Sequence, residues 1–166
     1  MRIVVVEDNE LYRDELLECL EQEESDIEII GSAANGARGL ALVEKLVWEK
    51  AGPDVIFTDI RMSEMDGFEM IEALQKRKIS CKIVITSSCP EFLYAKRAME
   101  LGAVDFLVKP LKTYEVRNVL RRLRRELESE KKWKHILNLD YIFPNAMAGK
   151  LKDDLQIKEL IKEGYG

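Results

Sequence analysis

The fold is decided by the sequence DVIFTD at residues 54–59, a run of strand-forming residues that ends in a carboxylate. Two similar apolar runs are IVVV at residues 3–6, followed by two acids, and FLV at residues 106–108, followed by a lysine. Ionised groups are costly at the ends of buried strands unless they meet one another or an ion. If the strands are parallel neighbours, their ends lie on one edge of a sheet. The charged side chains then form a single site.

Apolar runs of this kind recur through the first 110 or so residues and alternate with helical patterns. Residues 83–85 form another continuous run, and DIEII at residues 26–30 alternates as an edge strand does. The intervening apolar stripes are Leu11, Leu16, Leu17 and Leu20; Leu40, Val43 and Leu46; Phe68, Ile71 and Leu74; and Phe92, Ala95, Ala98 and Met99. Continuous runs are typical of parallel strands buried on both faces. The sequence therefore predicts an α/β fold with a doubly wound, five-stranded parallel sheet.

Composition narrows the functional classes. The chain has 166 residues, 46% of them hydrophobic, which is enough for one domain with an extension. Its net charge of -5 does not favour binding to nucleic acid. No apolar run is long enough for a membrane helix. The three cysteines, Cys19, Cys81 and Cys89, lack metal-ligand spacing, so we expect reduced thiols and a cytoplasmic protein. The single histidine, His135, cannot form a histidine metal cluster alone.

The acids at the strand ends predict a divalent-metal and phosphoryl site. Mg²⁺ prefers carboxylate, carbonyl and water oxygens. Glu7, Asp8 and Asp59 supply carboxylates from two strand ends, and the backbone carbonyl of Arg61 is a further candidate ligand. Beside the metal, Asp59 can act as a nucleophile toward a phosphoryl group and form an aspartyl phosphate.

Two more strand ends complete the expected site. Lys109 can pair with a phosphoryl oxygen through its compact ammonium charge. Ser87, which ends the strand after residues 83–85, can donate a hydrogen bond to another oxygen, and Thr86 is a competing hydroxyl. Each residue has an ordinary explanation as a turn, cap or strand end. All of them fall on one predicted edge, and we therefore interpret them as one site.

These residues resemble the receiver domain of two-component response regulators over roughly residues 1–125. The match comprises PDVIFTDIRM at residues 53–62 with MDG at residues 65–67, the acidic pair, and a lysine followed by proline. Ser87 and Lys109 lie 22 positions apart, the spacing that the family uses, which favours Ser87 over Thr86 as the switch hydroxyl. Two departures are Ser63, where proline is common, and Glu7, where many members have aspartate. Neither removes a metal ligand.

The resemblance implies a flavodoxin-like sheet of order 2-1-3-4-5 and a phosphorylation switch. A sensor histidine kinase would donate a phosphoryl group to Asp59 with Mg²⁺. Ser87 would then move inward, Phe106 would follow, and the surface of the fourth helix, fifth strand and fifth helix would change. For Phe106, a plain core role remains equally open. The implied activity is self-phosphorylation and slow autodephosphorylation rather than enzymatic turnover.

The end of the chain differs from the first 125 residues. Val116, Leu120, Leu123 and Leu127 have coiled-coil-like spacing in a helix of about 20 residues, and residues 150–163 read as a second amphipathic helix. The first three either form a homodimer seam or pack on their own sheet. The segments 91–96, 106–110 and 143–150 resemble AraC-type regulators. We expect residues 126–166 to be a helical linker, with the output domain absent or truncated and DNA contacted only through that domain.

Two other functions are compatible with an aspartate at a strand end. A phosphohydrolase of the haloacid dehalogenase type would need a second aspartate two residues after Asp59, where this chain has Arg61. A phosphorylation-independent interaction domain would be expected to lack an acid or the lysine, and none is missing. The favoured function is a response regulator receiver that controls an output such as transcription, with possible homodimerisation through the fourth- and fifth-helix face or the C-terminal helix.

Overall fold

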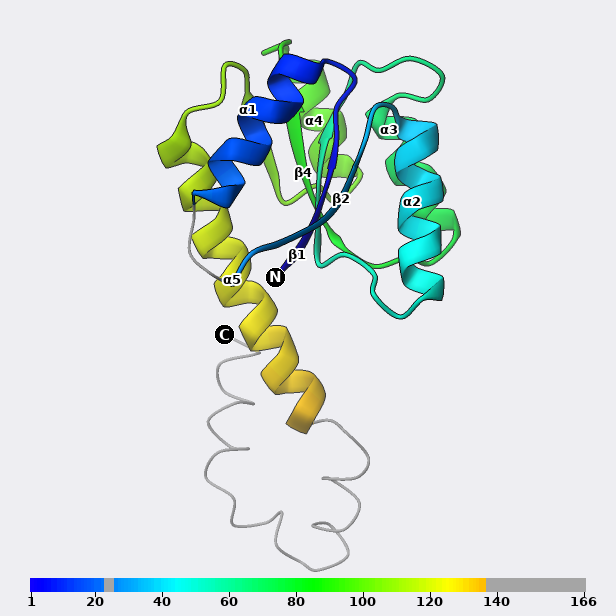
Figure 1. Ribbon diagram of the computed structural model, residues 1–166, viewed down its shortest axis with the longest axis vertical. Coiled ribbons are helices and arrows are strands. Elements are labelled where there is room, and N and C mark those ends of the chain that lie inside the picture. Colours follow the sequence, from blue (N-terminus) through cyan, green and yellow to red (C-terminus); the bar gives the residue numbers. More distant parts are fainter. Residues whose placement is uncertain (23–25, 137–166) are drawn as a thin grey trace, which may run out of the picture. The chain divides into compact units, whose positions relative to one another are not determined.

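The computed structural model describes residues 1–22 and 26–136, which form five strands and five helices (Figure 1). The elements in chain order are β1 (Arg2–Val6), α1 (Glu10–Glu21), β2 (Glu28–Ala33), α2 (Gly36–Trp48), β3 (Val55–Asp59), α3 (Gly67–Lys76), β4 (Lys82–Ser87), α4 (Phe92–Glu100), β5 (Asp105–Val108) and α5 (Thr113–Ile136). A boundary between two units of the chain falls between Arg124 and Arg125. The fold below is that of the first unit.

The five strands form one sheet in the order β2-β1-β3-β4-β5, and every neighbouring pair is parallel. This confirms the predicted doubly wound α/β fold and the order 2-1-3-4-5. The chain starts at β1, an inner strand, adds the edge strand β2 on one side, and then crosses back to add β3, β4 and β5 on the other side. The direction of winding reverses between β1 and β3, and ligands bind at such switch points in open α/β sheets.

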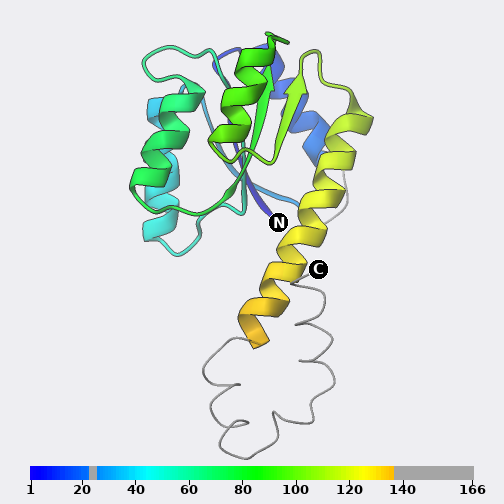
Figure 2. The same ribbon diagram turned by 180° about the vertical axis from the view of Figure 1, so that it is seen from behind.

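Helices cover both faces of the sheet, as the continuous apolar strands require. In Figures 1 and 2, α1 and α5 lie on one face and α2, α3 and α4 on the other. In β1, the four residues Ile3, Val4, Val5 and Val6 are all completely buried, which a strand with one wet face could not achieve. β3 is likewise buried at every position.

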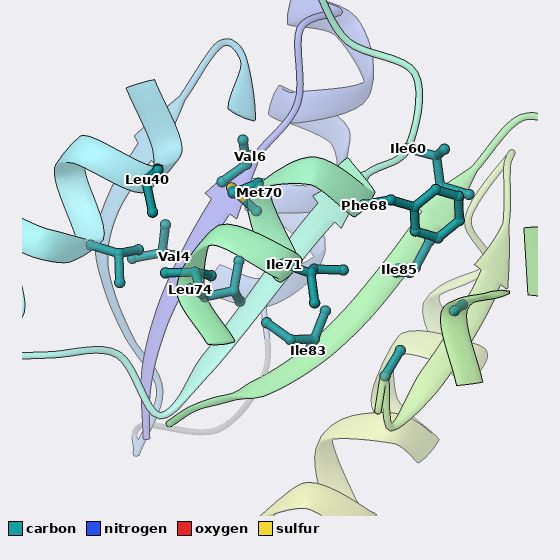
Figure 3. Close-up of a cluster of buried hydrophobic side chains, with 14 of the residues drawn as sticks. Val4, Val6, Leu40, Ile60, Phe68, Met70, Ile71, Leu74, Ile83 and Ile85 are labelled. Atoms are coloured by element: carbon teal, nitrogen blue, oxygen red, sulfur yellow. The ribbon is translucent and has the colours of Figure 1, made fainter. Parts of the chain in front are cut away.

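The core under α2, α3 and α4 is shown in Figure 3. Alternate strand residues, including Val4 and Ile83, face the helices there, and Phe68, Ile71 and Leu74 come down from α3. The spacing of these three side chains by three residues places them on one face of the helix. The predicted stripe of this helix is thus confirmed.

The sequence predicts an edge strand at residues 26–30. The structure has an edge strand there, but the predicted limits are wrong. The observed strand β2 runs from Glu28 to Ala33 and pairs with β1 as far as Val6. The side chain of Asp26 is instead bound by Arg124, with nitrogen–oxygen distances of 2.7 and 2.8 Å. The final residues Gly31, Ser32 and Ala33 carry no large apolar side chain, so the pattern could not reveal them.

The apolar stripe predicted for the fourth helix is also wrong in part. Of its four residues only Ala98 is buried, whereas Phe92 is 78% and Met99 is 60% exposed. In α1, Leu16 and Leu20 are buried as expected, but Leu11 is 72% exposed. Helical spacing identifies an apolar face without showing whether the domain itself covers that face.

The burial of the apolar seam of α5 shows whether it packs on its own sheet or forms a homodimer contact. Val116, Leu120 and Leu123 have at most 1% exposure within the single chain. They therefore pack on their own domain and are not free to form a seam between two molecules. The expected amphipathic helix at residues 150–163 lies outside the described residues. Within the described part, no helix combines the length and apolar character needed to span a bilayer.

We expect Leu123→Ala to lower the free energy of unfolding by about 2–5 kcal/mol, because it leaves a cavity in the core. Leu93→Ala, at a leucine that is 72% exposed, is the matched control and should change it by about 0.5 kcal/mol or less. Urea unfolding followed by circular dichroism measures both. A seam between molecules would instead make the effect of Leu123→Ala depend on protein concentration.

Candidate phosphoryl and metal site

The register of the sheet brings the predicted site residues to one edge. Val6 lies opposite Thr58 in the neighbouring strand, so Glu7 and Asp8 follow β1 at the level where β3 ends in Asp59. On the other side of β3, Ser87 closes β4 and is paired with Val108, after which Lys109 follows. Because all the strands are parallel, these ends share one edge.

Lys109 forms ion pairs with two of the acids at this edge. Its Nζ lies 2.5 Å from a carboxylate oxygen of Glu7 and 3.1 Å from Oδ2 of Asp59. The side chains of Lys109 and Glu7 are each 2% exposed and that of Asp59 is 11% exposed. The backbone N–H of Lys109 donates to the Ser87 carbonyl at 2.9 Å, and the Lys109–Pro110 peptide bond is cis. One ammonium group thus balances two almost fully buried carboxylates.

Asp59 is held by its immediate surroundings. Its Oδ1 accepts a hydrogen bond of 2.7 Å from the backbone N–H of Ile60, which leaves Oδ2 to face Lys109. The start of α3 lies against the same backbone, since a Cβ at Gly67 would come within 2.1 Å of the Asp59 carbonyl oxygen. Only glycine fits there. Asp66 before it forms a capping box with Glu69, which fixes the helix start.

The surroundings of Glu7 disfavour its charged form. Burial raises the pKa of its carboxyl, and the negative charge of Asp59 acts in the same direction, while the hydrogen bond from Lys109 opposes them. The backbone N–H of Asn9 also donates to Glu7, at 3.3 Å. Because Glu7 has little access to water, its charged form is costly unless a cation is near.

Glu7, Asp8 and Asp59 form a potential metal-binding group. Each offers a carboxylate oxygen, and these three oxygens lie within 4.8 Å of one another. Asp8 is exposed, whereas the other two acids are buried. A donor set made only of oxygens suits a hard cation such as Mg²⁺. The role of the Arg61 backbone carbonyl as a further ligand stays a prediction.

A cavity of about 250 Å³ opens in front of these groups. Ser87 lines it together with the acids and Lys109, whereas the competing hydroxyl Thr86 is not among its lining residues. The Ser87 Oγ accepts a hydrogen bond of 3.1 Å from the backbone N–H of Cys89. Cys89 and Arg61 also line the cavity.

Phe106 lies apart from this cavity. Its side chain is half-buried, packs against the core under α4, and lines a separate hollow that includes Lys112 and Glu115. Its proposed switch movement stays a prediction.

Two tyrosines near the site were not predicted from the sequence. Tyr12 lines the cavity, and the ammonium group of Lys109 lies 4.7 Å from the centre of its ring. Tyr94 of α4 accepts a hydrogen bond of 3.1 Å from the guanidinium of Arg61. Tyr12 lies in the first turn of α1, the helix that follows the acidic pair, and this closeness in sequence could have indicated it. Nothing in the sequence pattern links Tyr94 to Arg61.

A family model described as the response regulator receiver domain matches residues 3–121. This chain belongs to that family. The match extends over most of the chain and includes every predicted site residue, from Glu7 to Lys109. The resemblance inferred from the motifs is therefore confirmed.

Individual relatives agree with this assignment. The transcriptional regulatory protein BtsR of Escherichia coli (strain K12) is 36% identical over 126 residues, which are 76% of this chain and 49% of that protein. LiaR of Bacillus subtilis (strain 168), also a transcriptional regulatory protein, is 31% identical over 99% of this chain and 77% of its own length. This chain thus spans about half the length of its BtsR relative.

A solved structure gives the same fold. The receiver domain of AraT, a response regulator from Geobacillus stearothermophilus, superposes with a TM-score of 0.68 at 25% identity, over 78% of this chain and 97% of that domain. The chain is therefore a response regulator receiver with relatives among transcriptional regulators, and its signalling role follows from the family.

The raised pKa of Glu7 predicts a pH dependence of stability without metal. Above pH of about 4.3, the ordinary glutamate pKa, the unfolded chain releases this proton before the folded chain does. The free energy of unfolding therefore falls as pH rises through the folded-state pKa, by at most about 1.4 kcal/mol per pH unit for one proton. Urea unfolding in EDTA across this range measures the fall.

Glu7→Gln should remove this component, and Glu15→Gln, at an exposed glutamate of α1, should leave it unchanged. Equal pH profiles for wild type and Glu7→Gln would show that Glu7 titrates normally in the folded protein.

Proposed function

We propose that Asp59 is the phosphoacceptor of this receiver and that a sensor histidine kinase is the phosphoryl donor. The observation that carries the proposal is the position of Asp59 Oδ2. Oδ2 lies 3.1 Å from the Lys109 ammonium, Oδ1 accepts the hydrogen bond from the Ile60 N–H, and Asp59 lines the cavity. One carboxylate oxygen is thus held and the other is available as a nucleophile.

The transfer reaction needs little from the protein beyond positioning and charge. An oxygen of Asp59 attacks the phosphorus of a phosphohistidine, the phosphorus–nitrogen bond breaks, and its electrons go to the imidazole nitrogen. Lys109 pairs with a phosphoryl oxygen, exchanging part of its contact with Asp59 for the transferred group. Ser87 donates its hydroxyl to a second phosphoryl oxygen. Glu7, still paired with Lys109, keeps the ammonium at the edge of the sheet.

Receiver domains bind Mg²⁺ in an acidic pocket, and the acidic cluster of this chain fits such an ion. Glu7, Asp8 and Asp59, with the Arg61 carbonyl, would hold it. When bound, Mg²⁺ would offset the negative charge of the acids and of the incoming phosphoryl group. The second acid, Asp8, contributes most of the site's exposed negative charge, because Glu7 and Asp59 share Lys109.

Phosphorylation would act as a switch rather than as a step of enzymatic turnover. Ser87 would move toward the phosphoryl group and Phe106 would move into the space it leaves, changing the face made by α4, β5 and α5. A hydrolase would need an acid two residues after Asp59, and Arg61 stands there with its guanidinium bound to Tyr94. We therefore propose a phosphoacceptor domain with only slow autodephosphorylation, acting in the cytoplasm.

The changed face is a candidate homodimer surface. Phe92, Leu93 and Met99 of α4 are exposed large apolar residues, and so is Val108 of β5. Because the seam residues of α5 are buried in their own domain, this face is favoured over the C-terminal helix.

We assign residues 1–125 to the receiver and 126–166 to a linker. By analogy with BtsR and LiaR, the output would be transcription, with DNA contacted through an output domain.

We expect Asp59→Asn to abolish phosphorylation by acetyl phosphate, because an amide oxygen is a poor nucleophile. Intact mass spectrometry with and without Mg²⁺ should show a single added phosphoryl group on the wild type, with metal only. Asp14→Asn, at an exposed aspartate of α1, should be labelled like the wild type. Undiminished labelling of Asp59→Asn would contradict the assignment. If the wild type accepted neither acetyl phosphate nor beryllofluoride, a phosphorylation-independent interaction domain would be favoured.

A further inference from the structure

Arg61 connects the site to α4. It follows Asp59 by two residues and lines the same cavity of about 250 Å³. Its guanidinium turns toward α4, where Nη2 donates a hydrogen bond of 3.1 Å to the Tyr94 hydroxyl. The guanidinium carbon lies 5.5 Å from the centre of the Tyr94 ring, within the range of a cation–π contact. In this state the positive charge of Arg61 is directed at a neutral partner.

The Tyr94 end of this contact is anchored. Its ring packs against the core and stacks on Phe68 of α3, with ring centres 6.1 Å apart and planes 14° apart. Phe68 is buried, and the guanidinium of Arg97 lies 4.7 Å from the centre of its ring. Arg97 in turn forms an ion pair of 3.1 Å with Glu72 of α3. Two aromatic rings and the Arg97 guanidinium thus tie α4 to α3.

The Arg61 end is the one that can move. Arg61 is exposed and lies in the loop after β3, whereas Tyr94 is half-buried in the helix. Rotating the long arginine side chain requires no change in the core. The guanidinium donor is charged in either contact, but a phosphoryl oxygen is also charged, so a bond to it adds the attraction of an ion pair that the neutral phenol cannot offer. A phosphoryl group on Asp59 would therefore compete successfully for the guanidinium.

We propose that Tyr94 is a positioning residue that holds Arg61 away from the phosphoryl site in the unphosphorylated protein, and that phosphorylation transfers Arg61 from Tyr94 to the phosphoryl group and releases α4 from the loop. The proposal rests on the proposed phosphorylation of Asp59. It adds a second connection between the site and α4, separate from Ser87 and Phe106.

Thermodynamic linkage turns this into a measurable effect. A contact that exists only in the unphosphorylated state opposes binding of the phosphoryl group by the same factor. Removing the Tyr94 hydroxyl should therefore tighten the binding of beryllofluoride, which stands for the phosphoryl group, by about three- to tenfold, the range of one ordinary hydrogen bond. Arg61→Ala should weaken binding, because the hydrogen bond from Arg61 to the phosphoryl group is stronger than the one to Tyr94.

The test is a double-mutant cycle with wild type, Tyr94→Phe, Arg61→Ala and the double variant, titrated with beryllofluoride in Mg²⁺ by calorimetry. Tyr114→Phe is the matched control, since its hydroxyl also makes an exposed hydrogen bond, of 3.0 Å, to Glu115. Tyr94→Phe should tighten binding in the wild-type background and have no effect in the Arg61→Ala background. Tyr114→Phe should have no effect in either background.

A second measurement needs no metal. Hydrogen exchange of the α4 amides should be faster in Tyr94→Phe than in the wild type and unchanged in Tyr114→Phe, because the helix is no longer bonded to the loop through the Tyr94 hydroxyl. The proposal is overturned if Tyr94→Phe leaves beryllofluoride binding unchanged, or tightens it equally without Arg61. If the wild type itself binds no beryllofluoride, the proposed function fails and this proposal fails with it. If the wild type binds and Tyr94→Phe has no effect, only this proposal fails.

Discussion

The ammonium group of Lys109 lies between two carboxylates that have almost no exposure to water, 2.5 Å from Glu7 and 3.1 Å from Asp59. None of these charges would be tolerated alone in the interior, since an isolated buried ion costs several kcal/mol or more. Together they leave one excess negative charge when both acids are ionised, and the exposed Asp8 adds another. The arrangement is compensated without a ligand, and its net negative charge and oxygen donors suit a divalent cation.

The rest of the fold serves to bring these three charges together. They come from residues 7, 59 and 109, and only parallel strands in the order β1-β3-β4-β5 place the three strand ends on one edge. Gly67 lets α3 begin directly against the backbone of Asp59, and a side chain there would collide with that carbonyl. The helices cover both faces of the sheet (Figures 1 and 2), and the three charged residues line the cavity at its edge.

The sequence predicts this fold well where burial and pattern coincide. The runs at β1 and β3 are apolar because both sheet faces are covered, and their charged ends could be assigned to one edge. The pattern fails where burial is decided by distant elements. Phe92 and Met99 have helical spacing but remain exposed on α4, and β2 extends into residues with no large side chain.

The sequence predicted which residues form the site better than it predicted how their side chains contact one another. Lys109 follows from its strand, but the 4.7 Å contact with Tyr12 depends on how α1 packs. The link from Arg61 to Tyr94 joins residues 33 positions apart on a loop and a helix, and no periodicity connects them. Such contacts follow from tertiary packing, and they are where this receiver can differ from others with the same motifs.

The most direct test of the account is to identify the phosphorylated residue chemically. Protein treated with acetyl phosphate and Mg²⁺ is reduced with borohydride, which converts an aspartyl phosphate to homoserine, and is then digested and sequenced by mass spectrometry. The account predicts homoserine at position 59 and at no other aspartate. Homoserine at another position, Asp8 included, with Asp59 unchanged would contradict it.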